Sequence, residues 1–393
     1  MNLLIQKKMK SYFTVNKKYN NDKKRVAIVY NYIHHYRVPI FSLLSQQTDI
    51  EYTIYSGTES EISIKKANKK LSIISPSDGG IRWVFLTNLW FFKFILFQKQ
   101  IIKPSFFFKF DTIIYLGNMY YISTWISALI SRLLRKKVIF WTHGYIKEEK
   151  NFKGFLRKIF FKIADEILVY GQRAKDILIS KGFEKDNIKL IYNSLDFELQ
   201  RELLPSKKSE LNLFKNNNLS IIGFIGRLTK QKKIFQLIEV LNNLKNKNRF
   251  NLLIIGDGDE FSNLKKIVES YNLSEYVLFR GSIYDEQINC DLISSMDLLV
   301  SPGEVGLTAI HSMTYGTPVI THNKFDKQMP EYEVIVPGLT GDFFDYSNPI
   351  ESMSSLIPKY YNKREKYSKN CKNTISSNYN PHKQLLIFNK VVI

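Results

Sequence analysis

Residues 301–320, SPGEVGLTAIHSMTYGTPVI, combine the residue types and spacing that most clearly suggest chemistry. A Ser-Pro-Gly turn is followed by Gly306 and Leu307, which open an expected helix. Free amide N–H groups and the dipole at a helix start favour an anion such as phosphate. His311 lies one turn further along, where a neutral imidazole accepts one hydrogen bond and donates another. The alternatives are an ordinary crossover, with Gly306 for close packing, and a helix-face histidine that binds nothing.

A second candidate anion site contains two cationic side chains. Arg227 follows Gly226 directly after an apolar run expected to be a strand, and Lys232 lies shortly after it. A guanidinium donates bidentate hydrogen bonds to phosphate oxygens, and an ammonium supplies a compact charge. The pattern therefore favours a phosphate site. The alternative is a basic surface loop, since further lysines flank the pair.

Strands and helices are expected to alternate along the chain, which indicates parallel sheets with helices on both faces. Apolar runs expected to be buried strands include residues 25–33, 50–57, 111–117, 137–144, 219–228, 249–259, 276–283 and 296–303. The polar stretch 203–218 reads as a linker between two such domains. We predict a basic flexible extension at 1–24, an N-terminal domain at 25–203, a C-terminal domain at 204–372 and a terminal helix at 373–393 that packs back on the first domain.

Two groups in the first domain follow expected strands, and ligands of doubly wound sheets bind at the carboxyl ends of strands. His143 ends the strand at 137–144, so we expect it to face the space between the domains. The segment HHYRVP (34–39) follows the first strand and should border the acceptor side. There Tyr36 and Arg37 are candidate acceptor contacts, with Arg37 suited to a phosphate. The two preceding histidines are not assigned between solvent and site.

The composition is that of a soluble globular protein, with 393 residues, 44% hydrophobic and 24% charged. We expect no signal peptide, because the first apolar run is interrupted early by lysines. The two cysteines have no metal or disulfide spacing, which fits a reducing cytosol.

The net charge of +21 is concentrated in the first half of the chain. Residues 1–200 hold 33 Lys+Arg and 16 Asp+Glu, against 24 and 20 in the rest. Nucleic acid and anionic membrane are the usual partners of such a field. We expect no nucleic acid, because no recognition motif is present. Residues 81–110 alternate aromatic clusters with lysines, which indicates either a segment at a membrane interface or a core helix with a lysine-rich outer face.

The chain resembles glycosyltransferases of the GT-B fold, family 4, of the bacterial polysaccharide-cluster type. The resemblance covers about residues 25–375 and rests on five segments in the family's order: GFIGRLTKQKKIFQLIEVL, LLIIGDGDEFSNLKKIV, VLFRGSIYDEQI, SPGEVGLTAIHSMTYGTPVI and MPEYEVIVPGLTGDFF. The first domain adds IYNSLD, in which Asn193 and Asp196 match the family's hinge segment. The resemblance implies an α/β GT-B fold, with two Rossmann-like doubly wound domains facing across a cleft.

The resemblance also implies roles for individual residues. The residues implied to act in catalysis are His143, Arg227 and Lys232, the last two at the donor diphosphate. Those implied to bind the donor are Gly226, Gly256, Gly258, Tyr284, Gly303, Glu304, Val305, Gly306, Leu307 and His311. Two further carboxylates, Glu331 and Glu333, fall in a segment that the family lays near the sugar or the interdomain face.

The sequence departs from the family at two glutamates that are separated by seven residues. Their positions fall on Gly303 and His311, and Glu304 lies one residue from the first. In the family the second glutamate accepts hydrogen bonds from the donor ribose, a role that His311 is able to keep. The identity of the transferred sugar is therefore left open.

The implied reaction is retaining transfer of a sugar from a nucleoside-diphosphate sugar, which is a co-substrate, so no cofactor is expected. No metal is expected either. The Asp-x-Asp pattern in DGDE (257–260) opens a helix, so Asp259 or Glu260 is better placed as a cap. The expected acceptor is a lipid-linked glycan at the cytoplasmic face of the membrane. The alternative is a non-catalytic nucleotide-sugar-binding or scaffold subunit, which the missing first glutamate supports.

Overall fold

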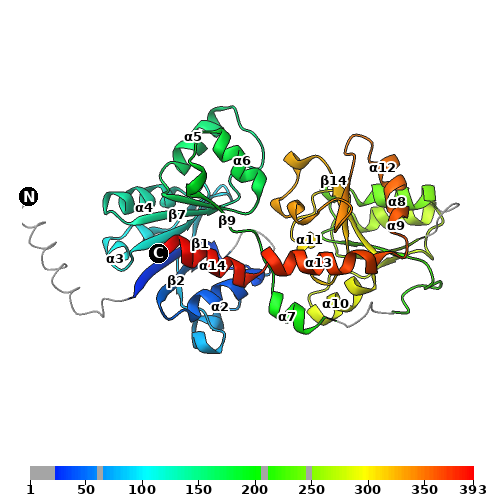
Figure 1. Cartoon of the computed structure of the whole chain (residues 1–393), viewed down its shortest axis with the longest axis horizontal. Helices are drawn as coiled ribbons and strands as arrows, with labels where there is room; N and C mark the ends of the chain where they lie inside the picture. Colours follow the sequence, from blue (N-terminus) through cyan, green and yellow to red (C-terminus); the bar gives the residue numbers. More distant parts are fainter. Residues whose placement is uncertain (1–22, 60–64, 205–210, 245–249) are drawn as a thin grey trace, which may run out of the picture.

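The computed structural model describes residues 23–59, 65–204, 211–244 and 250–393. The chain forms two domains that lie side by side, as Figure 1 shows. Most of the predicted basic extension at 1–24 lies outside the described residues, and Lys24 already belongs to the first strand. Within the described residues no helix is both long and apolar enough to cross a bilayer.

The N-terminal domain is built on a seven-stranded sheet in the order β3-β2-β1-β6-β7-β8-β9, and all of its strand pairs are parallel. The strands are β1 (Lys24–Tyr32), β2 (Ile50–Gly57), β3 (Trp83–Phe85), β6 (Thr112–Leu116), β7 (Lys137–Thr142), β8 (Glu166–Val169) and β9 (Ile188–Leu190). The central strands are buried along nearly their whole length, which is why they read as continuous apolar runs. The strand order reverses between β1 and β6, which is where such sheets open a crevice.

Helices cover both faces of this sheet. One face packs on α2 (Val38–Gln46) and on the terminal helix α14 (Pro381–Val392). The other face packs on α3 (Pro104–Phe107), α4 (Ile122–Leu133), α5 (Phe152–Phe161) and α6 (Gln172–Ser180). Helix α14 reaches the first domain from the second, and the Tyr52 hydroxyl donates to Asn389 Oδ1 at 2.9 Å (Figure 1).

Residues 81–110 do not form the core helix that was one of the two predicted alternatives. After β3 they form an antiparallel hairpin of β4 (Leu89–Phe91) and β5 (Ile95–Phe97), followed by a short 3-10 turn and α3. Phe92 and Lys93 have φ values of 50° and 63°. This left-handed pair forms the hairpin turn, and its backbone conformation is incompatible with a continuous helix through these residues. The other alternative, a segment at a membrane interface, stays a prediction.

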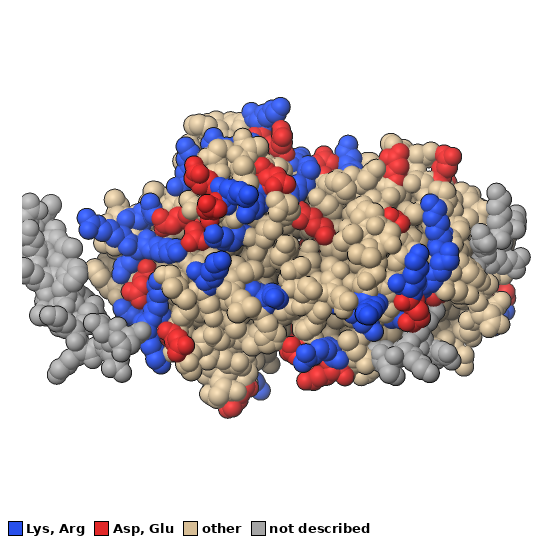
Figure 2. All heavy atoms as spheres, viewed as in Figure 1, with Lys and Arg blue, Asp and Glu red and all other residues tan. Residues whose placement is uncertain are grey.

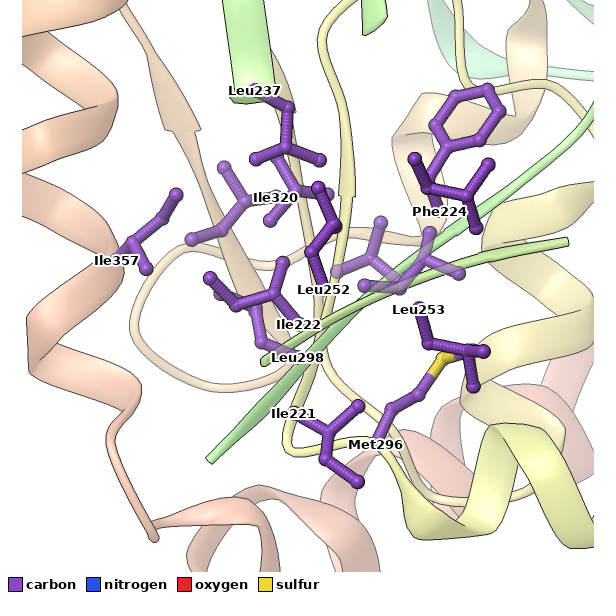
Figure 3. Close-up of a cluster of buried hydrophobic side chains, with 14 of the residues drawn as sticks. Ile221, Ile222, Phe224, Leu237, Leu252, Leu253, Met296, Leu298, Ile320 and Ile357 are labelled. Carbon is purple, nitrogen blue, oxygen red and sulfur yellow. The ribbon is translucent and has the colours of Figure 1, made fainter. Parts of the chain in front are cut away.

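The C-terminal domain repeats the architecture with a six-stranded sheet in the order β12-β11-β10-β13-β14-β15, again all parallel. The strands are β10 (Ile221–Ile225), β11 (Asn251–Ile255), β12 (Val277–Phe279), β13 (Leu298–Ser301), β14 (Val319–His322) and β15 (Gly341–Phe344). Its helices are α8 (Ile234–Leu244), α9 (Phe261–Ser270), α10 (Glu286–Ser295), α11 (Thr308–Thr314), α12 (Pro349–Leu356) and α13 (Arg364–Asn378). Figure 3 shows apolar side chains on both faces of its central strands, with Met296 beneath Leu253.

The two sheets confirm the predicted α/β architecture. Helix α7 (Phe197–Glu202) follows the last strand of the first domain and leads to the second. In the second sheet the order reverses between β10 and β13. The loops after these two strands hold the two candidate anion sites, so the topology brings them to one crevice.

Candidate functional site

A cavity of about 850 Å³ lies between the carboxyl ends of the two sheets. From the first domain it is lined by residues that follow β1, β6 and β7, among them His34, Tyr36, Arg37, Gly117 and His143. From the second domain it is lined by Glu304, Gly306, Leu307, Asp326, Met329 and Glu331. The cavity therefore joins the first-domain histidine predicted to act in catalysis to the turn before α11.

Three glycines allow the loops of the second domain to touch one another. A Cβ on Gly256 would lie 1.9 Å from the Gly226 carbonyl oxygen, and one on Gly258 2.5 Å from that of Leu228. A Cβ on Gly303 would lie 2.3 Å from the Gln231 oxygen. Because real Cβ atoms do not approach so closely, only glycine fits at these positions. The glycines position the loop of Arg227 and Lys232 against the turn before α11.

Lys232 is fixed by Glu304 at this junction. Its Nζ donates to the Glu304 carbonyl oxygen at 2.7 Å and lies 3.6 Å from the carboxylate Oε1. Burial lowers the pKa of Lys232, an effect to which the Arg227 charge adds and which Glu304 opposes. Arg227 itself is exposed. Lys232, a predicted ligand of the diphosphate, therefore contacts a residue that lines the cavity, whereas Arg227, on the same loop, is not among the lining residues.

Helix α11 begins at Thr308, after Gly306 in a left-handed conformation with φ 56°. It has only seven residues, so its dipole is short and the charge at this site comes mainly from the side chains. The structure does not favour Val305 as a donor contact. Its side chain is buried and its amide donates to Gln328 Oε1 at 3.0 Å, so neither is available to a ligand.

His311 contacts a carboxylate that the sequence did not single out. Its Nε2 lies 2.8 Å from Glu286 Oε1, at the first residue of α10. The same oxygen accepts from the Tyr315 hydroxyl at 2.6 Å and from Gln200 Nε2 at 2.9 Å. Burial alone would raise the pKa of Glu286, but these three hydrogen bonds outweigh it and lower the pKa to about 2. A charged Glu286 thus stands beside the position where the resemblance places a glutamate.

On the first-domain side, Arg37 lies beneath the cleft surface rather than at its rim. Only 2% of it is exposed, its Nη2 donates to the Tyr170 hydroxyl at 2.8 Å, and its guanidinium lies 4.7 Å from the Trp141 ring centre. Aromatic faces compensate part of the cost of burying this charge. This burial therefore disfavours the predicted direct contact between Arg37 and an acceptor phosphate.

His143 packs against Tyr170, the hydrogen-bond partner of Arg37, with the two ring centres 4.7 Å apart. Burial, reinforced by the Arg37 charge, lowers the pKa of His143 to about 4, so the imidazole is neutral at pH 7. Burial and the Arg37 charge also lower the pKa of His34 to about 4, so its imidazole is neutral at pH 7. The His34 ring stacks on that of Tyr36, with the ring centres 5.0 Å apart. Of the two histidines left unassigned by the sequence, His34 lines the cavity, whereas His35 is exposed and its Nδ1 lies 3.1 Å from the Lys65 carbonyl oxygen.

The segment MPEYEV places its two carboxylates differently. Glu331 lines the cavity, is 3% exposed, and accepts from Asn193 Nδ2 at 2.7 Å. Burial raises its pKa. Glu333 instead accepts from the backbone N–H groups of Gln172 and Arg173, the latter at 2.9 Å, at the first turn of α6. It therefore joins the two domains.

We expect Glu333→Ala to lower the free energy of unfolding by about 1 kcal/mol, the usual worth of a helix N-cap. The reason is that Gly171 at the N-cap position of α6 has no side chain, so Glu333 supplies the cap from the other domain. Thermal unfolding should show a fall in Tm of about 2–4 °C. Glu333→Gln keeps an acceptor oxygen and should recover part of the loss. Equal Tm values for the alanine variant and the wild type would contradict this role.

The remaining predicted residues lie outside this junction. Tyr284 is 72% exposed, and Lys65 Nζ of the first domain lies 5.8 Å from its ring centre. Glu260 occupies the N-cap position of α9, although its side chain makes no capping hydrogen bond. In the described ranges no three His, Cys, Asp or Glu side chains come together as metal ligands would.

The family model described as "Glycosyl transferases group 1" matches residues 206–376. A Klebsiella pneumoniae protein described as an uncharacterized 41.2 kDa protein in the cps region is 28% identical to this chain. That match covers 58% of this chain and 64% of the relative, so the chain spans less than two thirds of the relative's length.

Two solved structures are similar over nearly the whole chain. The lipopolysaccharide outer core galactosyltransferase WaaB, in its apo form, superposes with a TM-score of 0.68 and 16% identity over 93% of this chain and 99% of its own. Anabaena HepE in complex with UDP gives the same TM-score and identity over 94% and 99%. The shared architecture is the GT-B fold, which confirms the fold class predicted from the sequence.

Proposed function

We propose that this protein is a glycosyltransferase that moves a sugar from a nucleoside-diphosphate sugar to a glycan acceptor in surface polysaccharide biosynthesis. The observation that carries the proposal is the contact of Lys232 with Glu304 at the turn before α11, on the opposite side of the cavity from His143. Arg227 lies on the same loop as Lys232. The family match in the second domain and the cps-region relative support it. Family 4 and the polysaccharide-cluster type are part of the proposal.

In this proposal the second domain binds the donor. Arg227 and Lys232 hold the diphosphate, and the charge that develops on it as the glycosidic bond breaks is stabilised by these cations. The turn formed by Gly303, Glu304 and Gly306 borders the donor sugar. HepE, a structural neighbour, was solved with UDP. Tyr284 is the proposed neighbour of the nucleoside base, and its high exposure leaves room for a stacking base.

Glu286 is proposed to supply the carboxylate that position 311 lacks. Its Oε1 is occupied by three donors, and the described residues give no hydrogen bond to its Oε2. His311 then orients a neighbouring carboxylate rather than replacing one. The hydroxyl groups of the donor ribose can donate hydrogen bonds to this charged carboxylate oxygen, and such charge-assisted hydrogen bonds are strong.

The proposed mechanism retains the anomeric configuration. The acceptor O–H bond and the donor C1–O bond break, the new C1–O bond forms on the same face, and the proton passes to the departing diphosphate. Among the carboxylates lining the cavity, Glu331 is buried and held by Asn193, Glu304 is held by Lys232, and Glu149 is paired with Arg157. These partners disfavour all three as nucleophiles, and the proposal gives Asp326, the fourth, no part in the reaction. Neutral His143 is proposed to hydrogen-bond the reacting sugar.

We expect the product to keep the donor's anomeric configuration. Proton NMR of the product, observed from the first minutes of the reaction, reports the configuration of the new bond. The donor should first be identified by hydrolysis of a panel of UDP and GDP sugars, run with and without added magnesium to test metal independence. An inverted product, or turnover only with metal, would overturn the corresponding part of the proposal.

The acceptor side is proposed to take a lipid-linked glycan, with the protein peripheral on the cytoplasmic face of the membrane. Tyr36 lines the first-domain wall of the cavity, and the first half of the chain carries most of the positive charge. A basic surface attracts anionic lipid.

The second candidate is a non-catalytic nucleotide-sugar-binding or scaffold subunit. The observation that favours it is that Gly303 and His311 stand at the two glutamate positions of the family pattern. Donor hydrolysis separates the two candidates. A protein that binds the nucleotide sugar, as shown by thermal shift, but turns over none of the panel supports the scaffold.

A further inference from the structure

Helix α4 presents its apolar side chains outward and its small polar ones inward. The outward stripe has the spacing of one helix face and consists of Ile122, Ile126, Leu129 and Leu133. On the buried face, Ser127 Oγ donates to the Ile101 carbonyl oxygen at 2.8 Å, and the Tyr115 hydroxyl lies 2.7 Å from the same Oγ. A helix on a soluble domain normally buries its apolar stripe, so α4 is inverted.

Helix α5, beside α4, also exposes an apolar stripe, although it buries Phe160 and Phe161 as an ordinary helix does. Its exposed apolar side chains again share one face: Phe152, Phe155, Leu156 and Ile159. Beneath them the Trp125 and Phe160 rings lie 4.8 Å apart and join the two helices. Single exposed apolar residues are ordinary, but two adjoining stripes make a continuous patch, and such patches mark interaction sites.

The β4–β5 hairpin extends this surface. Phe91, Phe92 and Phe94 are exposed at its turn, with Lys93 between them. The Phe94 ring lies 5.5 Å from that of Tyr120, just before α4, and Lys153 Nζ of α5 lies 5.7 Å from the same ring. The hairpin turn and the two helix stripes therefore form one surface, which we term the outer patch.

The surroundings of the outer patch are strongly basic. Residues 89–164 hold 14 Lys+Arg and three Asp+Glu. Figure 2 shows lysine and arginine side chains gathered on the N-terminal domain over the region of α3, α4 and α5. Exposed aromatic and aliphatic side chains within a basic field match the interface of a bilayer that contains anionic lipid.

We propose that the outer patch docks on the surface of an anionic lipid bilayer, with the hairpin turn and the two helix stripes in the headgroup region. The inference rests on the proposed function, because it gives the lipid-linked acceptor its route. Tyr120 and Lys153 border the outer patch and also line the cavity between the domains. Docking therefore brings the cavity mouth to the bilayer, and an acceptor headgroup reaches the cleft without leaving the membrane.

Vesicle flotation of the full chain tests the proposal. The wild type should bind vesicles that contain phosphatidylglycerol and bind pure phosphatidylcholine far less. The double variant Leu133→Glu, Phe155→Glu should lower partitioning at least tenfold. Lys150 is exposed directly before the N-cap of α5. Lys93→Glu with Lys150→Glu should lower partitioning about fivefold per lysine on anionic vesicles, since one basic residue near the surface contributes about 1 kcal/mol. The matched control Phe235→Glu, an exposed apolar residue of α8 in the other domain, should bind as the wild type does.

Donor hydrolysis in solution separates this inference from the proposed function. It should be unchanged in the Leu133, Phe155 double variant, and Phe92→Ser at the hairpin turn serves as a second variant if the first fails to fold. Wild-type binding by both variants would overturn docking through the outer patch. A wild-type dimer in sedimentation velocity that both variants dissociate would also overturn it, because the patch would then join two copies. Patch-dependent vesicle binding without any donor turnover would support docking and count against the proposed function.

Discussion

Replacing Arg227 by alanine is expected to lower kcat for sugar transfer by about 10²–10³-fold, the usual cost of removing one preorganised charge-stabilising group. Arg227 follows β10 on a loop that glycines hold against the turn before α11, and its side chain is exposed, so its loss should leave the fold intact. Steady-state kinetics with the identified donor should show a fall mainly in kcat, because the charge develops on the leaving diphosphate. Thermal unfolding should be within error of the wild type.

Lys230→Ala is the matched control for Arg227→Ala, since Lys230 is an exposed basic residue of the same loop. It should change kcat less than threefold or so, as expected for surface charge away from the reacting groups. Equal losses for the two variants would mean that the loop acts through its overall charge. Normal activity of Arg227→Ala would contradict the proposed role of Arg227 at the donor diphosphate and count against the proposed function.

The donor side could be predicted from the sequence because its signals are local. Gly226 and Arg227 follow an apolar strand directly, and the turn before α11 is marked by Ser-Pro-Gly. Parallel sheets then bring both loops to one crevice whatever the details of packing. The pairing of Lys232 with Glu304 follows from that crevice, but its geometry required the glycine contacts that only the structure shows.

Other features depend on contacts between distant segments and could not be predicted. Glu286, in α10, gains its role from His311 and Tyr315, in and at the end of α11, and from Gln200 in α7. Arg37 was expected at the acceptor rim, but the aromatic rings that bury it belong to Trp141 in β7 and to Tyr170 directly after β8. The outward stripe of α4 has the same period as an inward one. Periodicity therefore identifies the helix without saying which face is buried.

Glu286→Ala is expected to lower the free energy of unfolding by about 2–3 kcal/mol, because it leaves buried donors of His311, Tyr315 and Gln200 without their shared acceptor. It should also weaken binding of the nucleotide product about tenfold if the carboxylate contacts the ribose. Urea unfolding and calorimetry measure the two effects separately. Glu269→Ala, which removes an exposed carboxylate of α9, is the matched control and should change stability by less than about 0.5 kcal/mol.

The pH dependence of the same comparison distinguishes a charged carboxylate from a packing effect. The pKa of Glu286 is about 2 in the folded protein against 4.5 ordinarily, so its contribution is present above pH 4.5 and is lost as the pH falls towards 2. The difference in unfolding free energy between wild type and Glu286→Ala should therefore shrink by about 1 kcal/mol between pH 7 and pH 3.5. A difference that stays constant with pH would mean that Glu286 acts through its shape. Lost stability with unchanged nucleotide affinity would confine Glu286 to holding α10, α11 and α7 together, and would leave His311 without a part in donor binding.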